Sequence, residues 1–201
     1  MGRRRRQASV LAGRAGAGRT AGMMPRLHRV GLHLRPMTMA DAPAWFAYLS
    51  LPGAVEHTSW KLDGIEVLYP EIIASRPFDH DAPALFAIVD DLDELIGTVG
   101  FHTVWDAPRG GEIAYNLHPE HWGRGIASEA CLAIADWGLD IRGYDYVEAY
   151  CLDVNLASQH VLEKCGFRRD ELVRGLRIVQ GRTRDFWRFR LTRDALETDA
   201  D

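Results

Sequence analysis

The sequence predicts a domain of the α/β class, in which helices cover both faces of a mixed sheet. Segments in which apolar and polar residues alternate, as in strands, are interleaved with segments of helical periodicity. The chain has 201 residues, 47% of them hydrophobic, which suffices for one compact domain with its own core. It contains no internal repeat and no run of 18 or more apolar residues. We therefore expect a single α/β domain that does not span a membrane.

The first half of the domain is expected to contain a strand, two helices and then three successive strands. Helical spacing places Trp45 and Leu49 on one face, with Pro43 suited to a first turn. The acidic turn "DDLDE" separates two short apolar runs, which is typical of a hairpin. The predicted strands are residues 32–38, 84–90, 95–104 and 111–119, and the predicted helices are residues 39–50 and 64–77, the second broken at Pro70.

The second half alternates helices and strands and ends in two strands. Ile126, Ile134 and Trp137 fall on one stripe of a helix that Gly143 can end. Asn155 is placed to cap the next helix. The predicted helices are residues 125–140 and 155–166, and the predicted strands are residues 144–153, 167–174 and 183–192. The predicted order is thus β-α-α-β-β-β-α-β-α-β-β.

The N-terminal 26 residues differ from the rest of the chain. They contain seven arginines, no acidic residue and no periodic apolar face. We interpret residues 1–26 as a disordered basic leader, with Met23 or Met24 as an alternative start, and residues 27–201 as one domain. An export signal and a tail that binds nucleic acid are the alternatives, although Arg14 interrupts the apolar stretch that an export signal needs.

The remainder of the chain is acidic, with 17 basic residues against 28 acidic ones and a net charge of −11. This charge disfavours nucleic acid as the main partner and favours a cationic substrate such as an amine. Cys131, Cys151 and Cys165 show no metal-binding spacing. We therefore expect reduced thiols, no metal and a cytoplasmic location.

The stretch "HWGRGIASEA", residues 121–130, places two glycines directly before a predicted helix. Gly123 and Gly125 leave the backbone free of side chains, so the amides of residues 124–127 can point outward together. Such amides bind anions with the help of the helix dipole, and the side chain of Arg124 can add positive charge. A glycine turn that only starts a helix is the alternative interpretation.

Two other phosphate-binding motifs do not fit this stretch. The P-loop needs a Gly-Lys pair, which the chain lacks. The dinucleotide fingerprint needs Gly or Ala where Ser128 stands, and an acidic residue at the end of the next strand, whereas Asp140 belongs to the helix. A nucleotide-dependent oxidoreductase is therefore disfavoured.

Two motifs, taken together, indicate a family. "EIAYNLHPEHWGRGIASEA", residues 112–130, followed by "NLASQHVLEKCGF", residues 155–167, strongly resembles the GNAT superfamily of acetyl-CoA-dependent N-acetyltransferases. Within it the chain is similar to the branch of bacterial ribosomal-protein N-terminal acetyltransferases. The similarity covers about residues 30–195. It implies a mostly antiparallel sheet of six to seven strands that splays between its fourth and fifth strands.

The resemblance also implies an acetyl-CoA site. The pyrophosphate would bind the loop amides, and the pantetheine arm would pair with the fourth strand like an added strand. The superfamily has Arg or Gln where Trp122 stands, but tryptophan is usual in the resembling branch. The implied cofactor-binding residues are Leu117, His118, Trp122, Gly123, Arg124, Gly125, Ile126, Ala127, Ser128 and Asn155.

The resemblance makes Glu112 and Ser158 the catalytic candidates. Glu112 lies on the strand face expected to meet the acceptor, and would act as the base, with His102 and His118 as alternatives. Many members use a tyrosine as the acid, at the position where this chain has Leu162. Ser158 would then protonate the leaving thiolate. A helix-surface serine bonded to a carbonyl is the alternative.

The acceptor is expected to bind between the first two helices and the loop joining the last two strands, residues 175–185. Basic residues in that loop indicate a carboxylate or phosphate on the acceptor, whereas the acidic domain favours a polyamine; a peptide N-terminus or an amino-acid-like amine reconciles both. The candidate acceptor-binding residues are Glu56, His57, Trp60 and Arg177. The predicted function is acetyl transfer from acetyl-CoA to a primary amine, by a monomer or homodimer. The alternative is a catalytically idle module that senses acyl-CoA.

Overall fold

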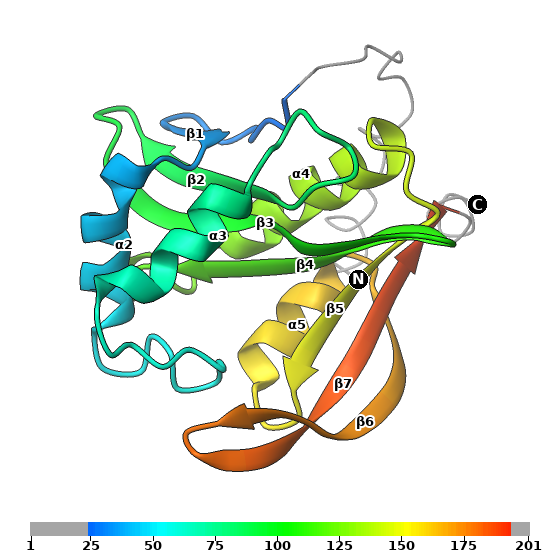
Figure 1. Cartoon of the computed structure of the whole chain (residues 1–201). Coiled ribbons are helices and arrows are strands. Elements are labelled where there is room, and N and C mark those ends of the chain that lie inside the picture. Colours follow the sequence, from blue (N-terminus) through cyan, green and yellow to red (C-terminus); the bar gives the residue numbers. More distant parts are fainter. Residues whose placement is uncertain (1–23, 194–201) are drawn as a thin grey trace, which may run out of the picture.

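The computed structural model describes residues 24–193, which form one seven-stranded sheet with helices on both faces (Figure 1). The spatial order of the strands is β1-β2-β3-β4-β5-β7-β6. Neighbouring strands are antiparallel except β4 and β5, which are parallel. The predicted α/β class with a mostly antiparallel sheet is confirmed. The strands are β1 Leu32–Pro36, β2 Ala84–Asp90, β3 Leu95–Asp106, β4 Arg109–Leu117, β5 Tyr146–Leu152, β6 Arg168–Val179 and β7 Arg182–Thr192.

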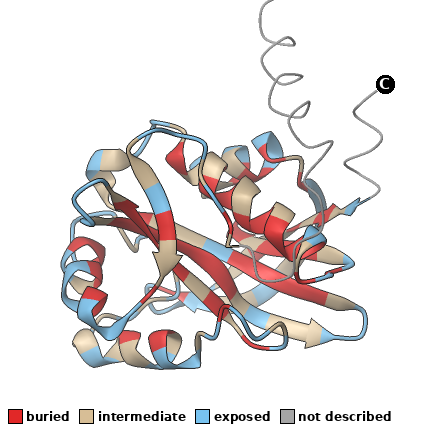
Figure 2. Cartoon of the chain, turned by 90° about the horizontal axis from the view of Figure 1, so that it is seen from above, coloured by how far each residue is buried: buried red, intermediate tan, exposed pale blue. Residues whose placement is uncertain are grey.

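The helices bury different faces of the sheet. Helices α2 and α3 pack against Ala87 and Val89 on one face. Helix α4 covers the other face, where Ile134 joins the largest buried cluster, and α5 adds Leu162 to that cluster. Figure 2 shows the buried residues concentrated along the strands and on the helix sides that face them. The helices are α2 Ala42–Leu49, α3 Tyr69–Ala74, α4 Ile126–Asp140 and α5 Leu156–Lys164.

Local capping signals place the helix ends close to the predicted positions. Asn155 caps α5, because its Oδ1 accepts the amide of Ser158 at 3.1 Å. Pro70, which was expected to break a helix, instead lies in the first turn of α3, after a short 3-10 helix at Ile65–Leu68. A proline is tolerated there because the amides of a first turn have no partner within the helix.

The predicted loop at residues 175–185 is wrong, because most of it belongs to β6 and β7. Val179 pairs with Arg182, so the connection is a two-residue turn at Gln180 and Gly181. Both turn residues have positive φ, 50° and 73°, as a tight hairpin turn requires. The alternation was hidden because β6 is exposed along most of its length. The missed signal was the Gln-Gly pair between two strand-like runs, which is typical of a tight hairpin turn.

The sheet splays between β4 and β5, as the resemblance implied. Their parallel pairing covers only Gly110 to Glu112 of β4, opposite Tyr146 to Glu148 of β5. Beyond Glu112 the strand β4 continues for five residues, and β5 continues to Leu152, without pairing to each other. At about 3.3 Å per residue, the unpaired edge of β4 is roughly 16 Å long.

The N-terminal segment packs on the domain from Met24 onward. Met24 and Leu27 contact the largest buried cluster, although the sequence placed Met24 in a disordered leader. The prediction for residues 1–23 lies outside the described residues. No helix within residues 24–193 is long and apolar enough to cross a membrane.

Candidate active site

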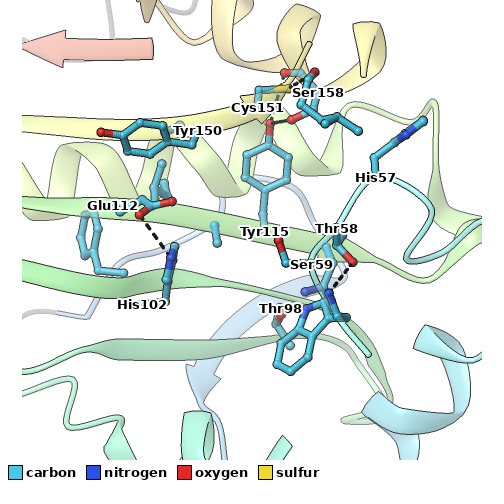
Figure 3. Close-up of a pocket in the computed structure, with 18 of the residues that line it drawn as sticks. His57, Thr58, Ser59, Thr98, His102, Glu112, Tyr115, Tyr150, Cys151 and Ser158 are labelled. Atoms are coloured by element: carbon cyan, nitrogen blue, oxygen red, sulfur yellow. Dashed lines mark hydrogen bonds and ion pairs between the residues drawn. The ribbon is translucent and has the colours of Figure 1, made fainter. Parts of the chain in front are cut away.

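A cavity of about 440 Å³ occupies the splay between β4 and β5. Strand β4 lines it with Glu112 and Tyr115, strand β5 with Tyr150 and Cys151, and helix α5 with Ser158. Figure 3 shows two groups of these side chains, in which Tyr115 meets Ser158 and Cys151, whereas Glu112 lies with His102 and Tyr150 further along the strands. Two segments far apart in the sequence therefore build one site.

At the open end of the splay lies the anion loop, residues 122–128. Gly123 and Gly125 have φ of 72° and 78°, a conformation that strains other residues. Gly125 is the N-cap of α4, so the first-turn amides that follow it have no acceptor within the helix. A Cβ at Gly123 would meet no described atom within 4 Å, and one at Gly125 would meet only Arg29, at 3.6 Å. The space in front of the loop is thus open, and it fits a phosphate group.

Only the backbone of the first turn of α4 is available to a ligand. The side chains of Ile126 and Ser128 are buried, whereas those of Trp122 and Arg124 are exposed. Arg124 therefore keeps its side chain at the surface beside the loop. The sequence predicted the glycine turn before this helix, but it did not show which side chains turn inward; that the loop binds a ligand stays a prediction.

Arg29 lies beside the anion loop in an ion pair with Glu129, a contact that no sequence pattern indicated. Its Nη2 donates to the carbonyl oxygen of Arg124 at 2.9 Å, and its Nε donates to Glu129 at 3.3 Å. The same carboxylate accepts the amides of His28 and Arg29 at 2.6 and 2.7 Å. These bonds join segments a hundred residues apart, so no local pattern could have predicted them.

The end of β4 offers a different set of backbone groups from the set expected. The amide of His118 donates to the carbonyl of Ile96 on β3 at 2.8 Å, so it is not available to the cleft. Alternation along β4 then turns the backbone groups of Tyr115 and Leu117 away from β3, toward the splay. The carbonyl of Leu117 accepts Nε1 of Trp122 at 2.9 Å. Trp122 thus ties the anion loop to the cleft edge of β4.

Glu112 lies at the closed end of the splay and is buried, with only 6% of its surface exposed. Its carboxylate accepts Nη2 of Arg177 at 2.6 Å and lies 3.3 Å from Nε2 of His102. Burial alone would raise the pKa of Glu112, but the hydrogen bonds and charges of His102 and Arg177 lower it below its usual value. Glu112 is therefore an anion at neutral pH. The Nδ1 atom of His102 is buried and makes no hydrogen bond within residues 24–193.

Ser158 points into the cleft and meets a tyrosine from the opposite strand. The hydroxyl of Tyr115 lies 2.9 Å from Ser158 Oγ and 3.3 Å from the Ser158 carbonyl oxygen (Figure 3). The thiol of Cys151 lines the same cavity and donates to the carbonyl oxygen of Asn155 at 3.5 Å, and burial raises its pKa. The sequence assigned Tyr115 only to the apolar face of its strand, and the missed signal was a phenol on a strand that borders the splay.

A second cavity of about 330 Å³ lies between the segment after α2 and the β6–β7 turn. Glu56 and His57 line it from one side, and Arg182 and Arg184 from the other. His57 also lines the first cavity, so the two are continuous along that residue. The predicted acceptor residues are divided between them, since Trp60 and Arg177 line the first cavity.

Arg177 is not free to bind an acceptor, contrary to the role predicted for it. Besides the Glu112 ion pair, its guanidinium stacks over the rings of Tyr150 and Phe186, at 5.6 and 5.7 Å from their centroids. Arg184 is engaged less tightly, 3.6 Å from Asp153. Arg182 is exposed and forms no ion pair within the described part of the chain.

Among residues 24–193 no group of three or more His, Cys, Asp or Glu side chains is arranged to hold a metal ion. The three cysteines are buried and form no disulfide within the described residues. The polar groups that line the cleft include carboxylate, imidazole, guanidinium, amide, thiol, hydroxyl and phenol side chains.

Comparison with known proteins agrees with this geometry. A family model described as an acetyltransferase (GNAT) domain matches residues 31–168. The chain is 31% identical over 155 residues to the uncharacterized N-acetyltransferase YoaA of Bacillus subtilis, covering 76% of this chain and 88% of that protein. It is 30% identical over 176 residues to the uncharacterized N-acetyltransferase p20 of Bacillus licheniformis, covering 84% and 96%.

Solved structures share the fold. Mycobacterium smegmatis RimJ in complex with CoA-disulfide superposes with a TM-score of 0.73 at 24% identity, covering 86% of this chain and 89% of that one. Spermidine N-acetyltransferase from Vibrio cholerae in complex with CoA and spermine gives 0.71 at 19% identity, covering 83% and 98%. A splayed sheet with an anion loop at its open end defines an acyltransferase of the acyl-CoA-dependent class. The chain belongs to the GNAT acetyltransferase family.

Proposed function

We propose that this protein transfers the acetyl group of acetyl-CoA to a primary amine, by direct attack of the amine on the thioester. The observation that carries the proposal is the cleft between β4 and β5. It begins at an anion loop with open space in front of Gly123 and ends at the buried carboxylate of Glu112. A donor with phosphates at one end and a thioester at the other matches both ends.

The donor is proposed to bind chiefly through backbone groups. The amides of residues 123–127 and the guanidinium of Arg29 would hold the pyrophosphate. The pantetheine arm would pair with the cleft-facing backbone groups of Tyr115 and Leu117, which replaces the expected role of the His118 amide. Asn155 borders the same cavity, and its side-chain oxygen is used in capping α5. Its amide nitrogen is then the group offered to the arm.

The amine is proposed to lose its proton at the Glu112–His102 pair. Glu112 stays ionised, so it attracts an ammonium group but is a weak proton acceptor. With the proton of neutral His102 on the buried Nδ1, the lone pair of Nε2 is left to take the proton of the amine, and the Glu112 carboxylate 3.3 Å away stabilises the imidazolium. The Glu112 carboxylate orients the imidazole, and His102, an alternative at the sequence level, becomes the base. Ser158 remains the proposed proton donor to the leaving sulfur.

The acceptor is proposed to be a peptide N-terminus or an amino-acid-like amine. Its amino group would reach Glu112 through the first cavity, past His57 and Trp60. An acidic group further along would lie in the second cavity, beside Arg182. Two arginines against one carboxylate, Glu56, line that cavity, and this balance of charge favours an acidic group over the second ammonium of a polyamine.

An acceptor screen tests the proposal. The full chain is incubated with acetyl-CoA and a panel of peptides, amino acids and polyamines, and acetylated products are identified by mass spectrometry. We expect acetylated peptides or amino acids, together with stoichiometric release of free thiol. A protein that binds acetyl-CoA and acetylates no amine in the panel would refute the transfer reaction and would support the idle sensor module instead.

A further inference from the structure

The hydroxyl pair of Tyr115 and Ser158 is the polar contact that crosses the splay. Tyr115 comes from β4 and Ser158 from α5, and their hydroxyl oxygens lie 2.9 Å apart (Figure 3). Both residues line the cavity in which the proposed donor arm would lie. Nothing in the strand pattern requires a phenol at this position, since the neighbouring core-facing positions are Ile113 and Leu117.

The contacts around the two hydroxyls favour one direction for the hydrogen bonds. The phenol has a single proton, and the distance to Ser158 Oγ is shorter than the 3.3 Å to the Ser158 carbonyl. Burial raises the pKa of Tyr115 well above its usual value, so the phenol keeps its proton and remains a donor. Ser158 Oγ, once it accepts from Tyr115, must direct its own proton elsewhere.

That proton is free to turn into the cavity, which Ser158 lines together with Cys151. The thiol of Cys151 is buried at 3% exposure and donates to the carbonyl oxygen of Asn155 at 3.5 Å, so it has a partner of its own. The cavity beside Ser158 is where the sulfur of the proposed donor would lie. Burial raises the pKa of Cys151, so that thiol stays neutral and does not compete as a nucleophile.

We infer that Tyr115 is a positioning residue, which donates to Ser158 Oγ and thereby directs the Ser158 proton at the sulfur atom of the bound donor. The inference rests on the proposed function and extends it. Where many family members have a tyrosine on α5, this chain has Leu162. Tyr115 supplies a phenol from strand β4 instead. The hydroxyl of Ser158 would rotate freely without a partner. The hydrogen bond from Tyr115 fixes its orientation.

The proton balance of the step is complete. As the carbon–nitrogen bond forms and the carbon–sulfur bond breaks, the electron pair passes to sulfur, which takes the proton of Ser158. Ser158 recovers a proton through solvent water from the one that the amine released. Tyr115 keeps its own proton throughout, and the net change moves one proton from nitrogen to sulfur.

The test measures the thiol pKa of bound coenzyme A, which needs no acceptor. Ultraviolet absorbance of the thiolate is titrated in complexes with coenzyme A, and complexes with desulfo-coenzyme A are subtracted to remove the protein thiols. A donor aimed at sulfur stabilises the thiolate and lowers its pKa. We expect Ser158→Ala to raise the bound thiol pKa by about one unit and Tyr115→Phe by about half a unit. The double variant should match Ser158→Ala alone.

Tyr146→Phe is the matched control. Tyr146 also has a half-buried hydroxyl in a side-chain hydrogen bond, with Trp105, but does not line the cavity. It should leave the bound thiol pKa unchanged. An unchanged pKa in Tyr115→Phe, or additive shifts in the double variant, would overturn the inference and leave the proposed function intact. Failure of the wild-type chain to bind coenzyme A in calorimetry would overturn the proposed function, and this inference with it.

Discussion

The two ends of the cleft are built in different ways. At the proposed donor end the groups offered to the ligand are chiefly backbone amides of one short loop, and the side chains of Ile126 and Ser128 turn into the core. At the proposed acceptor end they are side chains. Glu112 and His102 come from two neighbouring strands and His57 from the segment after α2, while Arg177 of β6 holds Glu112. The amides of the donor end are thus local in sequence, and the acceptor end is assembled from remote segments.

The difference indicates where recognition of the donor and recognition of the acceptor each reside. A loop of backbone amides recognises a phosphate whatever the surrounding side chains are, so it suits a donor common to a whole family. Side chains from remote segments can change one at a time, so they suit an acceptor that varies. Substitutions at the two ends should therefore affect different measured quantities, coenzyme A affinity at one end and turnover or acceptor KM at the other.

The largest effect is expected at the donor end. Gly125→Val places a branched side chain in the space before the loop and should weaken coenzyme A binding about 100-fold, or ~2.7 kcal/mol, in calorimetry. Gly143→Val is the matched control, because Gly143 also has positive φ, 71°, and follows the other end of α4. Both variants should lose similar folding stability, and only Gly125→Val should lose binding. Equal binding by the two variants would show that the loop is only a helix start.

At the acceptor end, Glu112→Gln should lower kcat about 100-fold while the Kd for coenzyme A stays unchanged, because the carboxylate orients His102 and attracts the ammonium group. Steady-state thiol release and calorimetry measure the two quantities. Glu148→Gln provides the control, since Glu148 pairs with Glu112 in register and is equally buried, but bonds to Arg190. A loss of activity in both variants would mean that the effect is structural.

A smaller effect is expected in the second cavity. Arg182→Glu should raise the KM for an acceptor with an acidic group about fivefold, leave kcat unchanged, and improve the KM for a polyamine. Arg168→Glu makes the same change of charge at the far end of β6. If both variants behaved alike, the effect would come from net charge and the second cavity would have no part in acceptor choice.

The smallest effect concerns stability against pH. The pKa of Glu112 is lowered in the folded protein, so its ion pairs stabilise the fold above the ordinary carboxyl value of 4.5 and lose that effect as pH falls through the lower folded value. Chemical unfolding should show Glu112→Gln less stable than wild type by about 1–2 kcal/mol at pH 7. This difference in unfolding free energy between variant and wild type should disappear in more acidic solution. A difference that stays constant with pH would indicate lost packing rather than lost charge.

Much of the fold was predictable because its signals are local. Strand alternation, the cap at Asn155 and the glycines of the anion loop each depend on a few neighbouring residues. The strands β6 and β7 were predicted, but the inner end of β6 was mistaken for loop, because an exposed ribbon carries polar residues on both faces and loses its alternation. Met24 was placed in the leader, since a contact with a distant core leaves no periodic pattern.

The sequence by itself determined the class of fold and the family, and it predicted the backbone site proposed for the donor, because a glycine-flanked helix start is a local feature of the chain. Only the tertiary structure decided which side chains meet in the cleft. It joined Tyr115 to Ser158, brought Arg29 to the loop, and committed Arg177 to Glu112. The physical reason is that hydrogen bonds and ion pairs act over a few ångströms in space, and distance along the chain says little about them.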